Sequence, residues 1–282
     1  MTVPREYPRG IKLVATDLDG TLLHSDGSVS DRSRSALKAA ADAGLLVVFV
    51  TGRPPRWLDV LVDETGYVGV AVGANGAVLY DMTTEEVITA RTLDQALMAE
   101  LGAAVRAEFP RVQFAVEYGN GFAAEPGYVH DWQINPPYDR RGVALARPRV
   151  GELDEILTEP AMKLLAKDRE VDADLFLNAV TALVGDRATI THSSSFGLLE
   201  ISAPGVTKAT GLADVADRHG VGPHQVAAIG DMPNDLPMLQ WAGHSYAVAN
   251  AHPSVIEVAD EVVDSNDDDA VAQLIEGLLN LQ

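Results

Sequence analysis

The sequence predicts an α/β protein, in which a Rossmann-like, doubly wound parallel sheet is interrupted by an inserted α+β cap domain. Short apolar runs alternate with amphipathic helical segments over residues 11–80, and the same alternation returns after residue 197. The stretch between these two parts contains turn-rich, hairpin-like segments instead. We therefore expect one sheet that is built from two separated parts of the chain.

Three apolar runs in the first part are expected to be strands. Residues 11–15, 45–50 and 68–72 are apolar and partly β-branched, and the second run has the continuous hydrophobicity of a buried parallel strand. A helix capped by Ser30 is expected between the first two. The turn sequence Asn75-Gly76 predicts a hairpin after the third.

The middle of the chain is expected to form the cap. Residues 84–195 begin with a helix predicted from Thr92, and repeated helix-then-strand order predicts one sheet with its helices on one face. Alternation resumes with a strand predicted at 198–201. The predicted core therefore comprises residues 1–83 and 196–282.

Composition narrows the possible partners and compartments. The chain has 282 residues, with 21 Lys and Arg against 41 Asp and Glu, and its formal net charge is −20. Such an acid excess argues against nucleic acid, whose phosphates are held chiefly by Lys and Arg. The chain contains no cysteine, which excludes disulfides and thiolate metal sites. No segment is predicted to span a membrane and no signal peptide is recognised, so a cytoplasmic location is expected.

Two acids follow the first predicted strand. In Asp17-Leu18-Asp19-Gly20-Thr21-Leu22, both carboxylates stand at the carboxyl edge of the sheet, where open α/β sheets bind ligands. Neighbouring carboxylates repel each other unless a cation joins them, and Mg²⁺ prefers oxygen ligands. A solvated acidic turn is the alternative interpretation of this pair taken alone.

Three further segments end predicted strands or open helices at the same edge. Thr51-Gly52 offers a hydroxyl and backbone N–H groups for phosphate oxygens. Lys208 opens a helix, and Gly230-Asp231-Met232-Pro233-Asn234-Asp235 supplies acids and an amide after another strand. Each segment alone is compatible with an ordinary turn, exposed lysine or helix cap. Their combination predicts a site for a phosphate and a metal.

In this order, the four segments resemble those of the haloacid dehalogenase superfamily of phosphatases, and in particular its Cof-type branch. The resemblance covers nearly the whole chain. It implies that Asp17 is the nucleophile and a metal ligand, and that Asp19 is the general acid and base, with its backbone carbonyl on the metal. It also implies a backbone N–H from Leu18 for phosphate and Asp231 as the remaining protein ligand of Mg²⁺.

The resemblance also implies roles for the other motif residues. Thr51, Gly52, Lys208 and Asn234 correspond to phosphate-binding positions, and Asp235 corresponds to an acid behind the metal ligands. The implied activity is Mg²⁺-dependent hydrolysis of small phosphorylated metabolites, with sugar phosphates as the leading substrate class, by a monomer or small homo-oligomer.

Three alternatives concern the cap and the reaction. His130, Trp132 and Arg141 belong to a polar and aromatic cluster that could recognise substrate, although a surface loop explains the cluster equally well. A phosphomutase also uses two aspartates in the first motif. A phospho-aspartate receiver has a similar acidic pocket, but it has no use for a cap or for Asp19.

Overall fold

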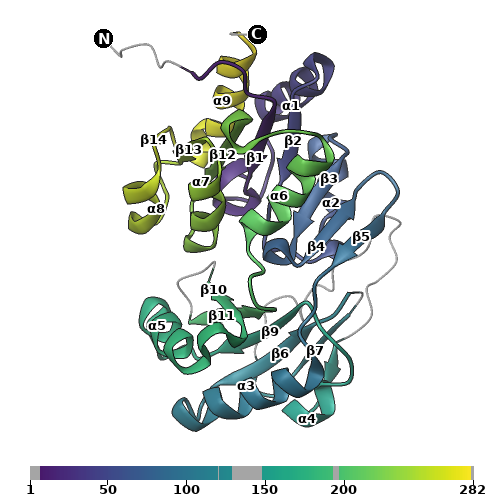
Figure 1. Ribbon diagram of the computed structural model, residues 1–282, viewed down its shortest axis with the longest axis vertical. Helices are drawn as coiled ribbons and strands as arrows, with labels where there is room; N and C mark the ends of the chain where they lie inside the picture. Colours follow the sequence, from purple (N-terminus) through teal and green to yellow (C-terminus); the bar gives the residue numbers. More distant parts are fainter. Residues whose placement is uncertain (1–6, 120, 129–147, 193–196, 281–282) are drawn as a thin grey trace.

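The computed structural model describes residues 7–119, 121–128, 148–192 and 197–280. Two units are visible in Figure 1, a larger α/β core that contains both ends of the described chain and a smaller cap. Each unit has its own hydrophobic cluster of buried residues.

The core is organised around a five-stranded sheet in which all strands are parallel. Its strand order is β14-β13-β12-β1-β2. The strands are β1 (Leu13–Thr16), β2 (Leu46–Phe49), β12 (Val226–Gly230), β13 (His244–Ala247) and β14 (Glu261–Val262). β1 and β12 are buried along their whole length, as expected for central strands covered on both faces.

Helices pack on both faces of this sheet. They are α1 (Asp31–Ala43), α2 (Asp59–Thr65), α6 (Lys208–Arg218), α7 (Leu236–Trp241), α8 (Pro253–Val258) and α9 (Ala270–Leu279). α1 packs against α9, and α6 packs against α7. Ser30 is confirmed as the N-cap residue of α1, since its hydroxyl accepts a hydrogen bond from the Ser33 N–H at 2.9 Å. The doubly wound parallel sheet is thus confirmed.

A small antiparallel sheet follows the core strand β2. It consists of β3 (Val70–Gly73), β4 (Val78–Asp81) and β5 (Glu86–Ala90), and a single parallel bridge joins Val50 to Val72. The predicted hairpin is confirmed, and its turn residue Asn75 has a φ of +56°. The predicted cap begins at residue 84, but β5 pairs with β4, so residues 86–90 belong to this small antiparallel sheet and not to the cap sheet.

The cap contains a six-stranded sheet with the order β10-β11-β9-β6-β7-β8. Its strands are β6 (Gln113–Glu117), β7 (Phe122–Ala124), β8 (Arg149–Val150), β9 (Lys163–Lys167), β10 (Thr189–Thr191) and β11 (Leu198–Ser202). Its helices are α3 (Gln95–Glu108), α4 (Leu153–Ile156) and α5 (Ala173–Val184), and they lie on the side of the sheet away from the core (Figure 1). One sheet with its helices on one face was the predicted arrangement.

Side-chain alternation explains the two faces of the cap sheet. Phe114 and Val116 of β6, with Leu164 and Ala166 of β9, belong to the cluster packed under the helices. The intervening positions, including Ala115, turn to the opposite face, toward the core. The cap therefore presents a helix-free sheet face to the core.

Two predicted elements near the ends of the cap differ from those in the structure. The strand predicted at 198–201 is β11, which pairs with β9 and belongs to the cap sheet rather than to the core. Helix α3 is capped by Asp94, whose carboxylate accepts a hydrogen bond from the Ala96 N–H at 2.8 Å, rather than by Thr92. By sheet pairing the cap ends at Ser202.

Short helical turns connect several of these elements. They are η1 (Leu18–Leu22), η2 (Pro55–Trp57), η3 (Ala74–Gly76), η5 (Gly185–Arg187), η6 (Pro223–Gln225), η7 (Pro233–Asp235) and η8 (Asn266–Asp268). Among the described residues, no helix combines the length and apolar character that a membrane crossing requires.

Candidate active site

Asp17 and Lys208 form a buried ion pair at the carboxyl edge of the parallel sheet. Asp17 directly follows β1, and Lys208 is the first residue of α6, which Thr207 caps through a hydrogen bond to the Thr210 N–H. Lys208 Nζ lies 2.8 Å from Asp17 Oδ1. The Lys208 side chain is 0% exposed, so its charge depends on these protein contacts.

The loop after β12 adds two acids to this pair. Lys208 Nζ lies 2.5 Å from Asp235 Oδ1, and Asp235 Oδ2 accepts hydrogen bonds from the N–H groups of Asp231 and Met232, each at 3.0 Å. Asp231 Oδ1 accepts a hydrogen bond from the Thr21 hydroxyl at 3.0 Å. Three strand-end segments that are far apart in sequence are therefore joined at one point.

Two glycines allow the loops to approach the acids closely. Gly20 has a φ of +78°, and a Cβ atom there would lie 2.5 Å from Asp231 Oδ2. At Gly230, a Cβ atom would lie 2.5 Å from the Asp235 carboxyl carbon. A side chain at either position would displace a carboxylate of the cluster.

The carboxylates are held in an environment that opposes their ionisation. Burial raises the pKa of Asp17 well above its ordinary value, against the lowering influence of Lys208. Burial, together with the charge of Asp235, raises the pKa of Asp231 to about 6. Burial would lower the pKa of Lys208, but the charges of Asp17 and Asp235 outweigh it and raise that pKa. One ammonium group faces three carboxyl groups.

The cluster is suited to a hard divalent cation. Asp17, Asp231 and Asp235 each offer one oxygen, and these oxygens all lie within 4.8 Å of one another. Carboxylate oxygens are preferred ligands of Mg²⁺, and a divalent ion would supply the positive charge that Lys208 alone does not. The donor set therefore fits the metal that the sequence predicted. Asp235 was not among the predicted ligands, and its two backbone hydrogen bonds and Lys208 contact favour the predicted supporting position.

The predicted phosphate-binding residues lie on adjoining loops. Thr51 is buried just beyond β2, and its carbonyl accepts a hydrogen bond from the Asn75 N–H at 3.0 Å. Asn234 Nδ2 donates to Asn75 Oδ1 at 3.1 Å, and Asn234 Oδ1 is buried without a hydrogen-bond partner among the described residues. Asn75 was predicted only as a turn residue. The structure shows that it joins the Thr51-Gly52 and Asn234 loops.

Asp19 has a different environment from Asp17. Its side chain is 60% exposed, and its two oxygens accept hydrogen bonds from Arg53, at 2.9 Å from Nε and 2.5 Å from Nη2. Its carboxylate is not part of the three-acid cluster. The predicted role of its backbone carbonyl on a metal stays a prediction, as does the predicted phosphate contact of the Leu18 N–H.

Charged residues of the cap reach the site region from the helix-free face of the cap sheet. Glu117, Lys163 and Glu200 are buried there and contact the core. Sequence reasoning missed all three, although Glu200, a single charged residue within the largely apolar β11, was an available signal. His130, Trp132 and Arg141, the predicted recognition residues, lie outside the described residues.

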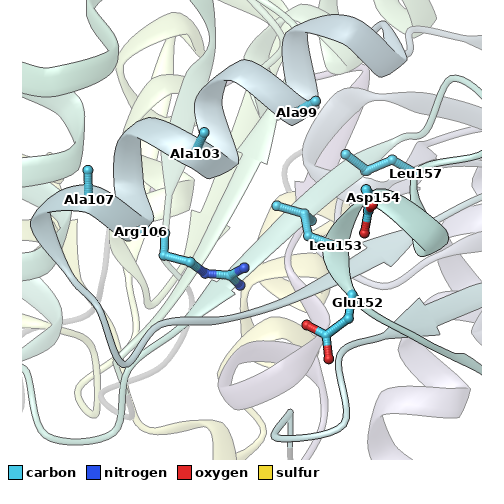
Figure 2. A pocket seen from close by; sticks show the side chains of 8 residues that line it. All are labelled: Ala99, Ala103, Arg106, Ala107, Glu152, Leu153, Asp154 and Leu157. Carbon is cyan, nitrogen blue, oxygen red and sulfur yellow. The ribbon is translucent and has the colours of Figure 1, made fainter.

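A cavity of about 560 Å³ lies elsewhere, on the helical side of the cap (Figure 2). Side chains of α3, with Ala99 and Ala103, form one wall, and the segment with Leu153 and Leu157 forms the other. Arg106 points from α3 toward this segment. None of the predicted motif residues lines the cavity, so it is separate from the acid cluster.

The chain is similar to known proteins over nearly its whole length. Residues 14–275 match the family model of haloacid dehalogenase-like hydrolases. The chain is 30% identical to YwtE of Bacillus subtilis, a 5-amino-6-(5-phospho-D-ribitylamino)uracil phosphatase, over 96% of this chain and 99% of the relative. It is 28% identical to YcsE of the same organism, which bears the same description, over 98% of each chain.

A solved structure extends the similarity to three dimensions. BT1666 of Bacteroides thetaiotaomicron, described among the phosphatases of the HAD enzyme superfamily, superposes with a TM-score of 0.75 at 27% identity. The match covers 96% of this chain and 97% of BT1666. The structural similarity therefore covers both the core and the cap.

Proposed function

This chain belongs to the haloacid dehalogenase-like hydrolases and is a phosphatase, and from the geometry of its site we propose that it acts through a phospho-aspartate on Asp17 with Mg²⁺ as cofactor. The observation that carries this proposal is the buried Asp17–Lys208 pair within a cluster of three acids. It combines a carboxylate nucleophile with an ammonium group that can offset phosphate charge.

In the first step, an oxygen of Asp17 attacks the phosphorus atom of the ester, and the bond from phosphorus to the leaving oxygen breaks. Asp19 donates a proton to that oxygen, so the alcohol departs neutral. To do so, the Asp19 carboxyl group must leave Arg53, which holds both of its oxygens in this structure. Its exposure leaves room for this rotation.

In the second step, Asp19 takes a proton from water while the water oxygen attacks the phosphorus atom. The bond from phosphorus to Asp17 breaks, which regenerates the carboxylate and releases inorganic phosphate. Lys208, Thr51 and Asn234 would hold the phosphate oxygens in line for both steps. When bound by Asp17, Asp231 and the Asp19 carbonyl, Mg²⁺ would supply positive charge that screens the repulsion between Asp17 and the phosphate dianion.

The substrate class is proposed from the relatives. YwtE and YcsE are described as phosphatases of a phosphorylated ribitylamino compound, in which the phosphate is carried by a sugar-derived polyol. We extend this class to the present chain and propose a small metabolite with a sugar or polyol phosphate as the substrate. This agrees with the leading class expected from the sequence.

A phosphate-release screen tests the proposal. Purified protein is offered a panel of sugar, polyol, nucleotide and cofactor phosphates, first with Mg²⁺ and then after verified metal removal with excess chelator. We expect the fastest release from a sugar or polyol phosphate, its loss on chelation and its recovery with Mg²⁺. Undiminished release without metal would contradict the metal assignment, and a preference for nucleotides would contradict the substrate class.

A further inference from the structure

Three charged side chains form a row across the helix-free face of the cap sheet. Glu117 of β6 lies directly opposite Lys163 of β9 in the antiparallel register. On the other side of β9, Lys163 Nζ lies 3.0 Å from Glu200 Oε1 of β11. We call Glu117, Lys163 and Glu200 the cap row. Their exposed fractions are 5%, 2% and 7%, so the whole row is buried where the cap meets the core.

The first two members of the cap row contact the core segment that follows β2. Lys163 Nζ donates a hydrogen bond to the Gly52 carbonyl at 2.6 Å. Glu117 accepts two hydrogen bonds from the Arg56 guanidinium, one of them at 3.1 Å from Nη2. Both contacts thus hold the segment that begins with the Thr51-Gly52 phosphate loop.

The third member contacts the other phosphate-binding loop through one intermediate. Glu200 Oε2 accepts a hydrogen bond from Asn75 Nδ2, and the same amide group lies 3.3 Å from the Thr191 hydroxyl of β10. The side-chain oxygen of Asn75, Oδ1, in turn accepts a hydrogen bond from Asn234 Nδ2 at 3.1 Å. Asn234 is therefore oriented from the cap through Asn75.

The charges of the row are balanced locally. Two carboxylates face the Lys163 ammonium and the Arg56 guanidinium. This balance matters because the Glu200 carboxylate is close to the phosphate loop: a Cβ atom on Gly52 would lie 3.6 Å from Glu200 Oε2. Without Lys163, that carboxylate would repel a phosphate dianion in the adjacent site.

From these contacts we propose that Lys163 and Glu200 are positioning residues, which fix the two phosphate-binding loops when the cap is closed on the core. The inference rests on the proposed phosphatase function and deepens it. The loops that hold the phosphate are then in their binding geometry only in the closed form. Lys163 has two effects, since it orients the Gly52 carbonyl and neutralises Glu200. Glu200 orients Asn75 and, through it, Asn234.

Two substitutions distinguish the orientation of the phosphate loops from the effect of the Glu200 charge on phosphate binding. Lys163→Met removes both effects of Lys163, and we expect inorganic phosphate to bind roughly 10-fold to 100-fold more weakly, with a similar loss in kcat/KM. Glu200→Gln keeps an oxygen that can accept from Asn75 but removes one negative charge beside the loop. We expect phosphate affinity to rise several-fold in this variant. The double variant should recover part of the affinity that Lys163→Met loses.

The recovery in the double variant distinguishes positioning from a merely structural role. A structural role predicts that the double variant is at least as impaired as Lys163→Met. Phosphate affinity is measured by calorimetry with Mg²⁺ present, and folding is checked by thermal unfolding. Arg106→Met is the matched control, because Arg106 pairs with Glu125 inside the cap. It should leave phosphate affinity unchanged.

The outcomes also separate this inference from the proposed function. A wild-type protein that neither hydrolyses phosphate esters nor binds phosphate would overturn the proposed function and the inference together. An active wild type beside a folded Lys163→Met variant of unchanged phosphate affinity would overturn the inference alone. If Lys163→Met does not fold, Glu200→Gln decides, and unchanged or weaker phosphate binding in that variant refutes the inference.

Discussion

Lys208 Nζ lies 2.8 Å from Asp17 Oδ1, and neither side chain has appreciable access to solvent. The same ammonium group lies 2.5 Å from Asp235. Lys208 is thus the cation that allows acids from two separate strand ends to approach each other. Its removal should affect both the stability of the site and its chemistry.

Lys208→Met is expected to destabilise the metal-free protein by about 3–5 kcal/mol, because it leaves buried carboxylates without their partner. Turnover should fall by roughly 10²-fold or more, since a group that stabilises transition-state charge is lost. Denaturant unfolding with and without Mg²⁺ and steady-state kinetics measure the two effects. Lys38→Met, at an exposed pair on α1, is the control and should change stability by less than about 0.5 kcal/mol. Wild-type turnover in Lys208→Met would refute its assigned role.

The raised pKa of Asp231 predicts an unusual pH dependence in the metal-free protein. Burial and Asp235 raise this pKa to about 6 in the folded state, whereas an aspartate in the unfolded chain titrates near 4. The folded state therefore retains the proton more strongly. The resulting stabilisation is complete below about pH 4 and is lost as pH rises through about 6, on the order of 3 kcal/mol in total.

Asp231→Asn isolates this contribution because asparagine cannot ionise. Without metal, the variant should gain stability relative to the wild type as pH rises from 4 to 7.5. Added Mg²⁺ should stabilise the wild type more at pH 7.5 than at pH 5, because protons compete for the same carboxylates. Unfolding curves across pH measure both trends. Parallel pH profiles for the two proteins would show that Asp231 does not have the raised pKa.

Asp17→Asn and Asp19→Asn should impair different steps of the reaction. Asp17→Asn removes the nucleophile, so no phospho-enzyme should form in rapid acid-quench mass spectrometry. Asp19→Asn should still be phosphorylated by an ester with a good leaving group, but turnover should fall about 10²-fold to 10⁴-fold. Wild-type turnover in Asp17→Asn, once contamination and deamidation are excluded, would contradict the phospho-aspartate mechanism.

The parallel sheet was predictable because its strands carry their own signal. Buried parallel strands such as β1 and β2 are continuous apolar runs. The predicted site acids and Lys208 could be placed as well, because open α/β sheets bind ligands at the carboxyl ends of their strands. The strand at 198–201 was also predicted, but it was assigned to the core sheet and not to the cap sheet. A short apolar run does not reveal its partner, and β11 is assigned to the cap only by its pairing with β9.

The residues that sequence reasoning missed depend on distant partners. Asn75 and Glu200 are 125 positions apart, and Lys163 and Gly52 are 111 apart. Their contacts exist only because the cap closes on the core, which no local pattern encodes. Arg53 directly follows the predicted Thr51-Gly52 segment, but its contact with Asp19 depends on how two separate loops fold toward each other.

The last prediction concerns the cap as a selector of substrates. The three acids and Lys208 belong to the core, and core and cap have separate hydrophobic clusters, so the core should fold after residues 92–204 are replaced by a short Gly/Ser linker. The shortened protein should still bind Mg²⁺ and slowly hydrolyse an activated aryl phosphate. It should lose the parent's ranking of natural phosphate esters, because the surface that faces the leaving group is gone and water enters freely.

The measurement is kcat/KM across the same ester panel for the parent and the shortened protein, with folding checked by circular dichroism. Arg111→Ala is the control, since Arg111 forms an exposed pair with Glu170 within the cap, and it should leave the ranking intact. Equal rankings and efficiencies in the parent and a folded, cap-free protein would require the selection of substrate to be assigned to the core loops instead. A folded core that binds Mg²⁺ but has similar kcat/KM values for all esters would support selection by the cap. The metal site contacts only the phosphate group, which every ester shares.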